Sequence, residues 1–200
     1  IQSLPCLFAV VLIWILWKRR HVEGVLYLIL FECAAAIWAI ADSFEHAATV
    51  LTIKTFWYQF SIFGASTIPV LFLLFTLAFT QNNKFINWKT SIILFAVPVI
   101  TILLTFTNQY HHLILKEVNI DPVANESIYY YGSWFWIYVF YELGLVVLSI
   151  IILFIGIHRF YNIYKKQIIY LIAAPVLPLT ATILFIFKLT PLRADLTPVA

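Results

Sequence analysis

Long apolar stretches separated by short polar segments make up most of the chain. A helix that crosses the hydrocarbon core of a bilayer needs about 20 mainly apolar residues. Six stretches reach or approach this length, and a further apolar segment starts shortly before Ala200. The pattern therefore predicts six transmembrane helices and the start of a seventh, at residues 4–17, 24–44, 56–80, 88–107, 134–158, 167–187 and 192–200.

The connection between the fourth and fifth predicted helices is the longest one, and its pattern is different. Residues 113–120 and 127–131 alternate between apolar and polar side chains, which is typical of β-strands. Asp121, Pro122 and Asn125 lie between them and favour a turn. We therefore predict an all-α polytopic transmembrane helix bundle with a short β-hairpin in this loop.

The composition supports a membrane environment. Hydrophobic residues make up 64% of the chain and charged residues 10%, whereas soluble domains are about half apolar and about a quarter charged. A soluble fold of this length could not bury so much apolar surface, but lipid can replace water around the outer faces. We expect one transmembrane domain over residues 1–200, whose seventh helix continues past Ala200. The sequence has no basic run with interleaved aromatic residues, so a nucleic-acid partner is not expected.

Basic residues are distributed unevenly between the two sides of the predicted bundle. Cytoplasmic loops of membrane proteins are enriched in Lys and Arg. The other side carries four basic residues mixed with acidic ones. This bias predicts a multi-pass plasma-membrane protein with its N-terminus outside and the end of its seventh helix inside. The eight basic residues of the predicted inner side are Lys18, Arg19, Arg20, Lys84, Lys89, Arg159, Lys165 and Lys166.

Two carboxyl groups, those of Glu32 and Glu142, fall inside predicted transmembrane helices. A carboxyl group in the hydrocarbon is energetically expensive and marks a functional position that faces the bundle interior. No Lys or Arg lies inside a predicted helix to pair with them, so we expect both to be protonated or hydrogen-bonded. An interhelical hydrogen bond that fixes packing and a ligand- or proton-sensing role are both open. The expected partners are Gln59, Ser61, Thr67 and Tyr141.

Other polar residues lie at the predicted outer side. Asp42, Glu45 and His46 share one face of the second helix, where a metal or cationic ligand could bind, but a solvated helix end is the preferred interpretation. His111 and His112 are adjacent and therefore point in different directions, and no Cys pair or H-E-x-x-H motif accompanies them. We predict no metal and no cofactor.

Four prolines fall inside predicted helices, and each removes a backbone hydrogen bond and kinks its helix. A membrane tolerates such a kink where a neighbouring group satisfies the freed carbonyl oxygen. The kinks are consistent with hinges and equally with static bends. The four residues are Pro69, Pro98, Pro175 and Pro178.

Several short sequence motifs occur in a characteristic order along the chain. They are F-W-Y-Q-F-S-I-F-G-A-S-T-I-P from Phe56, L-T-F-T-N-Q-Y-H-H-L-I from Leu104, G-S-W-F-W-I-Y-V-F-Y from Gly132, Y-K-K-Q from Tyr164 and D-L-T-P from Asp195. This series resembles the N-terminal seven-helix sensor region of bacterial and archaeal histidine kinases and diguanylate cyclases. The resemblance covers nearly the whole chain from the second helix onward.

The resemblance implies an extracytoplasmic N-terminus and a seventh helix that leads to a cytoplasmic kinase or cyclase domain in the same chain. It implies no catalytic residue in this region and names no ligand. The family's motif positions correspond to Trp57, Pro69, Thr107, Asn108, His111 or His112, Trp136, Tyr141, Gln167, Pro178, Asp195, Thr197 and Pro198.

The preferred interpretation is a sensory input domain that is not an enzyme. An unknown small ligand or membrane state would shift the bundle between two packings through its differential affinity for them. A homodimer is an open alternative to a monomer. The predicted ligand-binding residues are Asp42, Gln59, His111, Trp136, Tyr141, Glu142 and Asp195.

Two other functions compete with this interpretation. A transporter or proton-coupled carrier also fits intramembrane carboxyl groups and proline-broken helices, although the two halves of the chain do not repeat. A retinal-type photoreceptor requires a lysine deep in the seventh helix, whereas Lys188 lies at the outer end of the sixth.

Overall fold

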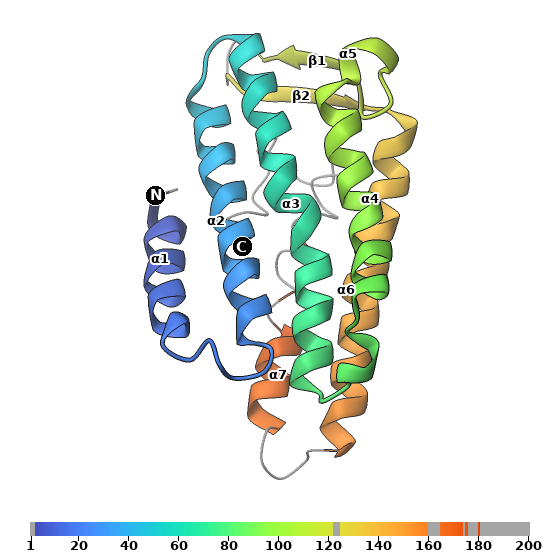
Figure 1. Ribbon diagram of the computed structural model, residues 1–200. Coiled ribbons are helices and arrows are strands. Elements are labelled where there is room, and N and C mark those ends of the chain that lie inside the picture. Colours follow the sequence, from blue (N-terminus) through green and yellow to red (C-terminus); the bar gives the residue numbers. More distant parts are fainter. Residues whose placement is uncertain (1–2, 122–124, 160–164, 174, 176–179, 181–200) are drawn as a thin grey trace.

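The computed structural model describes residues 3–121, 125–159, 165–173, 175 and 180. Long helices run alternately up and down, and a β-hairpin covers one end of the bundle (Figure 1). The predicted mostly helical fold with one hairpin is confirmed. The elements are α1 (Ser3–Trp17), α2 (Val25–Ala47), α3 (Leu51–Phe79), the 3-10 turn Asn83–Phe85, α4 (Trp88–Phe106), α5 (Asn108–His111), β1 (Leu115–Ile120), β2 (Ser127–Tyr131), α6 (Ser133–Arg159) and α7 (Lys165–Ala173).

Four of the described helices are long and apolar enough to cross a membrane, namely α2, α3, α4 and the segment Ser133–Gly156 of α6. α1 has 15 residues and packs against α2 at the edge of the bundle (Figure 1). Of the predicted sixth helix, the structure describes α7 and two further residues. The predicted start of the seventh helix at 192–200 lies outside the described residues.

The start of α3 and the presence of one short helix differ most from the prediction. α3 begins at Leu51, five residues before the predicted start at Phe56, and its first turn contains the buried Lys54. The prediction from apolar stretches missed this turn because a lysine normally marks the end of a transmembrane segment. The short helix α5 was also not predicted, because four residues are too few to show a helical period.

α3 is the central helix of the bundle and contacts α2, α4 and α6. Every residue from Pro69 to Ala78 is buried. Near the middle of the helix, Gly64 lies against the α2 backbone, because a Cβ atom at this position would be 2.3 Å from the carbonyl oxygen of Ala34. Small residues at helix contacts allow such close approach in membranes. α2 and α3 therefore form a closely packed pair.

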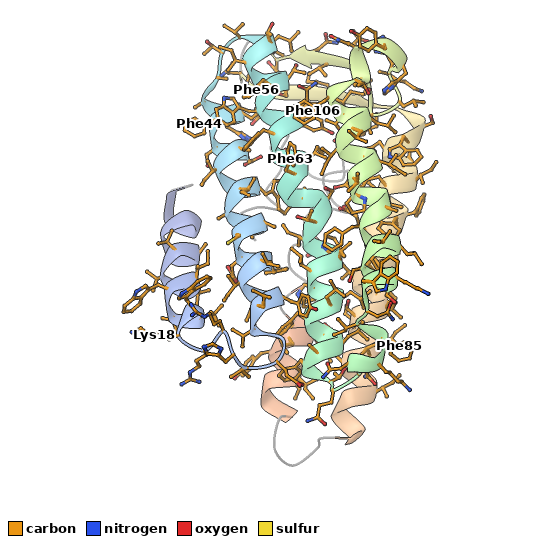
Figure 2. All side chains as sticks on the ribbon, in the orientation of Figure 1. Lys18, Phe44, Phe56, Phe63, Phe85 and Phe106 are labelled. Carbon is orange, nitrogen blue, oxygen red and sulfur yellow. The ribbon has the colours of Figure 1, made fainter. Side chains whose placement is uncertain are left out.

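The outer faces of the helices carry large apolar side chains. Figure 2 shows Phe44, Phe56, Phe63 and Phe106 along the surface of α2, α3 and α4, and each is at least 39% exposed. In water such a surface would promote aggregation, whereas in a bilayer it contacts lipid. The burial pattern therefore agrees with a multi-pass membrane protein.

The predicted hairpin is present, with β1 and β2 antiparallel and Ile120 paired with Ser127. Asn108 fixes its start, because its Oδ1 accepts hydrogen bonds from the backbone N–H groups of Ile114 (2.9 Å) and Leu115 (3.2 Å). At the other end, Gly132 links β2 to α6 where a Cβ would be 2.1 Å from the carbonyl oxygen of Leu113. These contacts hold the hairpin at the end of α4 and α6.

Candidate functional site

A group of polar side chains, buried on α2 and α3 and partly buried on β2, joins the hairpin to α2. We call Asp42, Glu45, Lys54, Ser127 and Tyr129 the hairpin-end cluster. Oε1 of Glu45 accepts a hydrogen bond from Oγ of Ser127 (2.9 Å) and another from the hydroxyl of Tyr129. Both donors belong to β2, so one carboxylate oxygen connects the hairpin to the C-terminal end of α2.

Lys54 occupies the same region from the first turn of α3. Its side chain is 1% exposed, and its Nζ donates a hydrogen bond to the backbone carbonyl oxygen of Glu45 (3.0 Å). The last carbonyl groups of a helix lack backbone partners and carry a partial negative charge, so they stabilise a cation. Burial of this ammonium group therefore depends on the end of α2.

Asp42 and Glu45 are both 7% exposed, so the preferred interpretation of a solvated helix end was wrong for these residues. The hairpin contacts Glu45 through Ser127 and Tyr129, and this contribution could not be read from the sequence of α2. His46 lies at the edge, where its Nδ1 is 2.9 Å from the backbone carbonyl oxygen of Asp42 and 3.5 Å from Oδ2. The predicted shared helical face of Asp42 and His46 is confirmed.

The Tyr129 hydroxyl acts as a hydrogen-bond donor over the whole physiological range. Burial raises the pKa of Tyr129 well above its usual value, and the charge of Glu45 and the hydrogen bond to it raise the pKa further. The ring of Tyr129 also packs against that of Tyr58, with centroids 4.7 Å apart. Asn125, which precedes β2, attaches the hairpin to the end of α2 a second time, because its Nδ2 donates to the carbonyl oxygen of Ala48 (3.1 Å).

The predicted ligand-binding residues have separate positions in the structure. Gln59 Nε2 donates to the carbonyl oxygen of Thr105 (3.2 Å), which links α3 to α4. His111 lies 3.1 Å from Oγ1 of Thr107 and accepts a hydrogen bond from the N–H of Leu113, so it stabilises the turn after α4.

Trp136 is 37% exposed and its ring contacts those of Tyr131 and Phe135. Asp195 lies outside the described residues. The structure thus places Asp42 in the hairpin-end cluster and gives Gln59, His111 and Trp136 other partners.

Tyr141 satisfies the carbonyl group that Pro98 leaves without a donor. Pro98 has no N–H for the carbonyl oxygen of Leu94 four residues earlier, and the Tyr141 hydroxyl donates to that oxygen across the α4–α6 contact (2.6 Å). The expectation that a neighbour satisfies a proline kink is therefore confirmed at this proline. Nearby, Trp134 Nε1 donates to Oγ1 of Thr101 (3.0 Å), so α4 is fixed to α6 at two levels.

Glu142 follows Tyr141 on α6. Its Oε1 is buried and has no hydrogen-bond partner among the described residues, while Tyr138 hydrogen-bonds to the carboxyl group. Glu32 is partly buried on α2. The four partners expected for these carboxyl groups donate to backbone carbonyl oxygens instead: those of Thr105, Tyr58, Phe63 and Leu94 for Gln59, Ser61, Thr67 and Tyr141 respectively.

Metal binding gains no support from the described part of the chain, where no group of three or more His, Cys, Asp or Glu side chains could hold an ion.

Lys54, Ser127 and Tyr129 were not among the predicted site residues. Ser127 and Tyr129 are two positions apart in a predicted strand and therefore point to the same side. This spacing was the available signal, but it did not identify the partner helix.

The profile of a protein family described as the N-terminal 7TM region of histidine kinase matches residues 2–200. The chain therefore belongs to this family, and the predicted resemblance is confirmed. The region is embedded in the membrane, is not itself catalytic, and belongs to a family that is attached to histidine kinases. No curated protein and no protein of solved structure matches the chain.

Proposed function

We propose that this region is the sensory input domain of a histidine kinase, and that its stimulus acts at the hairpin end of the bundle. The observation that carries this proposal is the hairpin-end cluster, in which buried polar groups from α2, α3 and β2 depend on one another. A movement of β2 away from α2 breaks the hydrogen bonds that Glu45 accepts from Ser127 and Tyr129 at once. The family's attachment to kinases favours a sensor over a carrier or a photoreceptor.

The proposal includes an orientation. The end opposite the hairpin, which we call the basic end, carries eight of the 12 Lys and Arg residues of the sequence. Because cytoplasmic loops are enriched in these residues, the basic end lies in the cytoplasm and the hairpin outside the cell membrane. The N-terminus is then extracytoplasmic, and the seventh helix leads inward to the kinase. A cyclase in place of the kinase stays a prediction.

α3 is the element that connects the two ends. Its first turn places Lys54 beside Glu45, and the helix continues without interruption to the apolar core around Leu74. A small ligand works only through different affinities for two packings of the bundle. We place its binding among the polar residues nearer the hairpin end, with Asp42, Gln59, His111, Trp136, Tyr141 and Glu142 as the candidates. Asp195, which lies outside the described residues, stays a candidate from the sequence alone.

The test uses the intact kinase that carries this region, reconstituted in proteoliposomes. Tyr129→Phe removes the hydroxyl that binds Glu45, whereas Tyr130→Phe alters an exposed ring on the same strand and is the matched control. Typical coupling between sites in an allosteric protein corresponds to about fivefold or more. We expect Tyr129→Phe to change basal autophosphorylation by at least that factor and Tyr130→Phe to leave it within about twofold.

Equal autophosphorylation of both variants and the wild type would refute the role of the hairpin end. The candidate residues are tested in the same assay with Asp42→Asn and Glu142→Gln. If both variants retain the complete response to the natural stimulus in cells, these two carboxyl groups do not belong to the site.

A further inference from the structure

The basic end carries exposed cations for which the described part of the chain supplies no acidic partner. Lys18, Arg19 and Arg20 follow α1, while Lys84 precedes α4 and Lys89 lies in its first turn, and all five are exposed. We call these five residues the basic rim. The ion pair between His46 and Asp42 lies at the other end of the bundle, beside the hairpin. The charge of the basic rim is therefore not neutralised by described residues of this chain.

The only acidic residue of these loops, Glu23, is directed to a neutral partner. Its Oε2 accepts a hydrogen bond from Nδ2 of Asn83 (2.8 Å). This bond joins the loop after α1 to the loop after α3. Lys84 is adjacent to Asn83, and Arg19 and Arg20 precede Glu23, so these cations belong to two loops that meet at the same end of the bundle.

Aromatic rings hold several of these cations at one level. Nζ of Lys18 lies 3.8 Å from the ring centroid of Trp14, and the guanidinium of Arg20 lies 4.8 Å from that of Trp17. Lys84 lies over Phe85 in the same way, at 5.0 Å. Lys18 and Phe85 both lie near the basic end in Figure 2.

The rings themselves are exposed, with 63% of Trp14 and 53% of Trp17 accessible. Tryptophan rings in membrane proteins occupy the headgroup level of the bilayer. The cations paired with them are therefore held where lipid phosphates lie, beside helix faces that contact hydrocarbon.

We propose that the basic rim binds the headgroups of anionic phospholipids. A guanidinium group donates two parallel hydrogen bonds to a phosphate, and each basic residue near an anionic membrane surface adds about fivefold in affinity. The exposed rings favour a lipid over a soluble anion, because only a lipid places acyl chains against them. This inference does not depend on the sensory role.

Native mass spectrometry of the full chain, released from nanodiscs with equal amounts of phosphatidylglycerol and phosphatidylcholine, tests this assignment. We expect the chain to retain phosphatidylglycerol preferentially. The triple variant Arg19→Gln, Arg20→Gln, Lys84→Gln should lower that preference by at least about tenfold. Lys116→Gln, at an exposed position of β1, is the matched control and should preserve it.

Three results would overturn the proposal: equal retention of the two lipids by the wild type, an unchanged preference in the triple variant, or an equal loss in the Lys116→Gln control. Glycerol phosphate added at excess separates the two sources of phosphate. If it displaces the lipid completely, the surface recognises a soluble anion and the lipid assignment is wrong. If phosphatidylglycerol is retained, the acyl chains contribute and the assignment is supported.

Discussion

The two halves of α3 are stabilised in different ways. Toward the hairpin, Lys54 and Gln59 make hydrogen bonds to α2 and α4, and buried polar groups join the helices to β2. Toward the basic end, Leu74 and its neighbours pack against apolar residues of α6, such as Leu145. Hydrogen bonds are directional and are lost with small displacements, whereas apolar packing is not directional. In the proposed function, the hairpin half detects a change and the apolar half transmits it.

The largest effect is expected for a substitution at Gly64, where α3 packs against α2 between its two halves. Gly64→Val would place side-chain atoms where a Cβ alone is 2.3 Å from the carbonyl oxygen of Ala34 and 2.7 Å from the N of Trp38. Because these are backbone atoms, α2 and α3 must separate. We expect a loss of more than about 4 kcal/mol in the free energy of unfolding, or no folded protein. Denaturant titration in detergent, followed by circular dichroism, measures this loss; near-wild-type stability would show that the two helices do not pack as described.

In the apolar half, Leu74→Ala should cost about 3 kcal/mol. Leu74 is 2% exposed, and truncation of such a side chain leaves a cavity that the bundle fills only in part. The matched control is Leu103→Ala on α4, where the side chain is 62% exposed and faces lipid. The same titration is used for both variants. Equal losses for the two would contradict the assignment of an apolar core to the basic half.

In the hairpin half, Tyr129→Phe should cost about 2 kcal/mol, because a hydrogen bond to an ionised carboxylate is stronger than a neutral one. The wild type should also show a specific pH dependence. The raised pKa of Tyr129 means that its stabilisation is complete below about pH 10 and is lost as the pH rises through the folded-state value. Stability measured from neutral to alkaline pH should therefore decline less in Tyr129→Phe than in Tyr130→Phe. Parallel curves would contradict the buried position of the Tyr129 hydroxyl.

The smallest effect is expected at the kink of α4. Tyr141→Phe should cost about 1 kcal/mol, since side-chain hydrogen bonds inside membranes are modest. In a Pro98→Ala background, the backbone N–H of residue 98 can donate to the carbonyl oxygen of Leu94. Tyr141→Phe should therefore cost less stability in that background. A double-mutant cycle measures the difference. A coupling energy of zero would show that Tyr141 does not compensate for the proline.

The sequence predicted those features that depend on a local period or length. Four helix spans and the hairpin follow from apolar stretches and from alternation, and the need for a donor near Pro98 follows from its missing N–H. The burial of Asp42 and Glu45 could not be predicted, because Ser127 and Tyr129 lie 82 and 84 residues after Glu45. Strand periodicity shows which side of β2 these residues share, but only the path of the chain determines which helix it covers.

The central claim is that α3 couples the hairpin-end cluster to the packing at the basic end. Spin labels at Ile93 of α4 and Phe154 of α6, both exposed, with Cys6 and Cys33 replaced by serine, report this packing by pulsed electron paramagnetic resonance in nanodiscs. We predict that Tyr129→Phe shifts or broadens the distance distribution between the labels, whereas Tyr130→Phe leaves it unchanged. Identical distributions in wild type and Tyr129→Phe would contradict the claim.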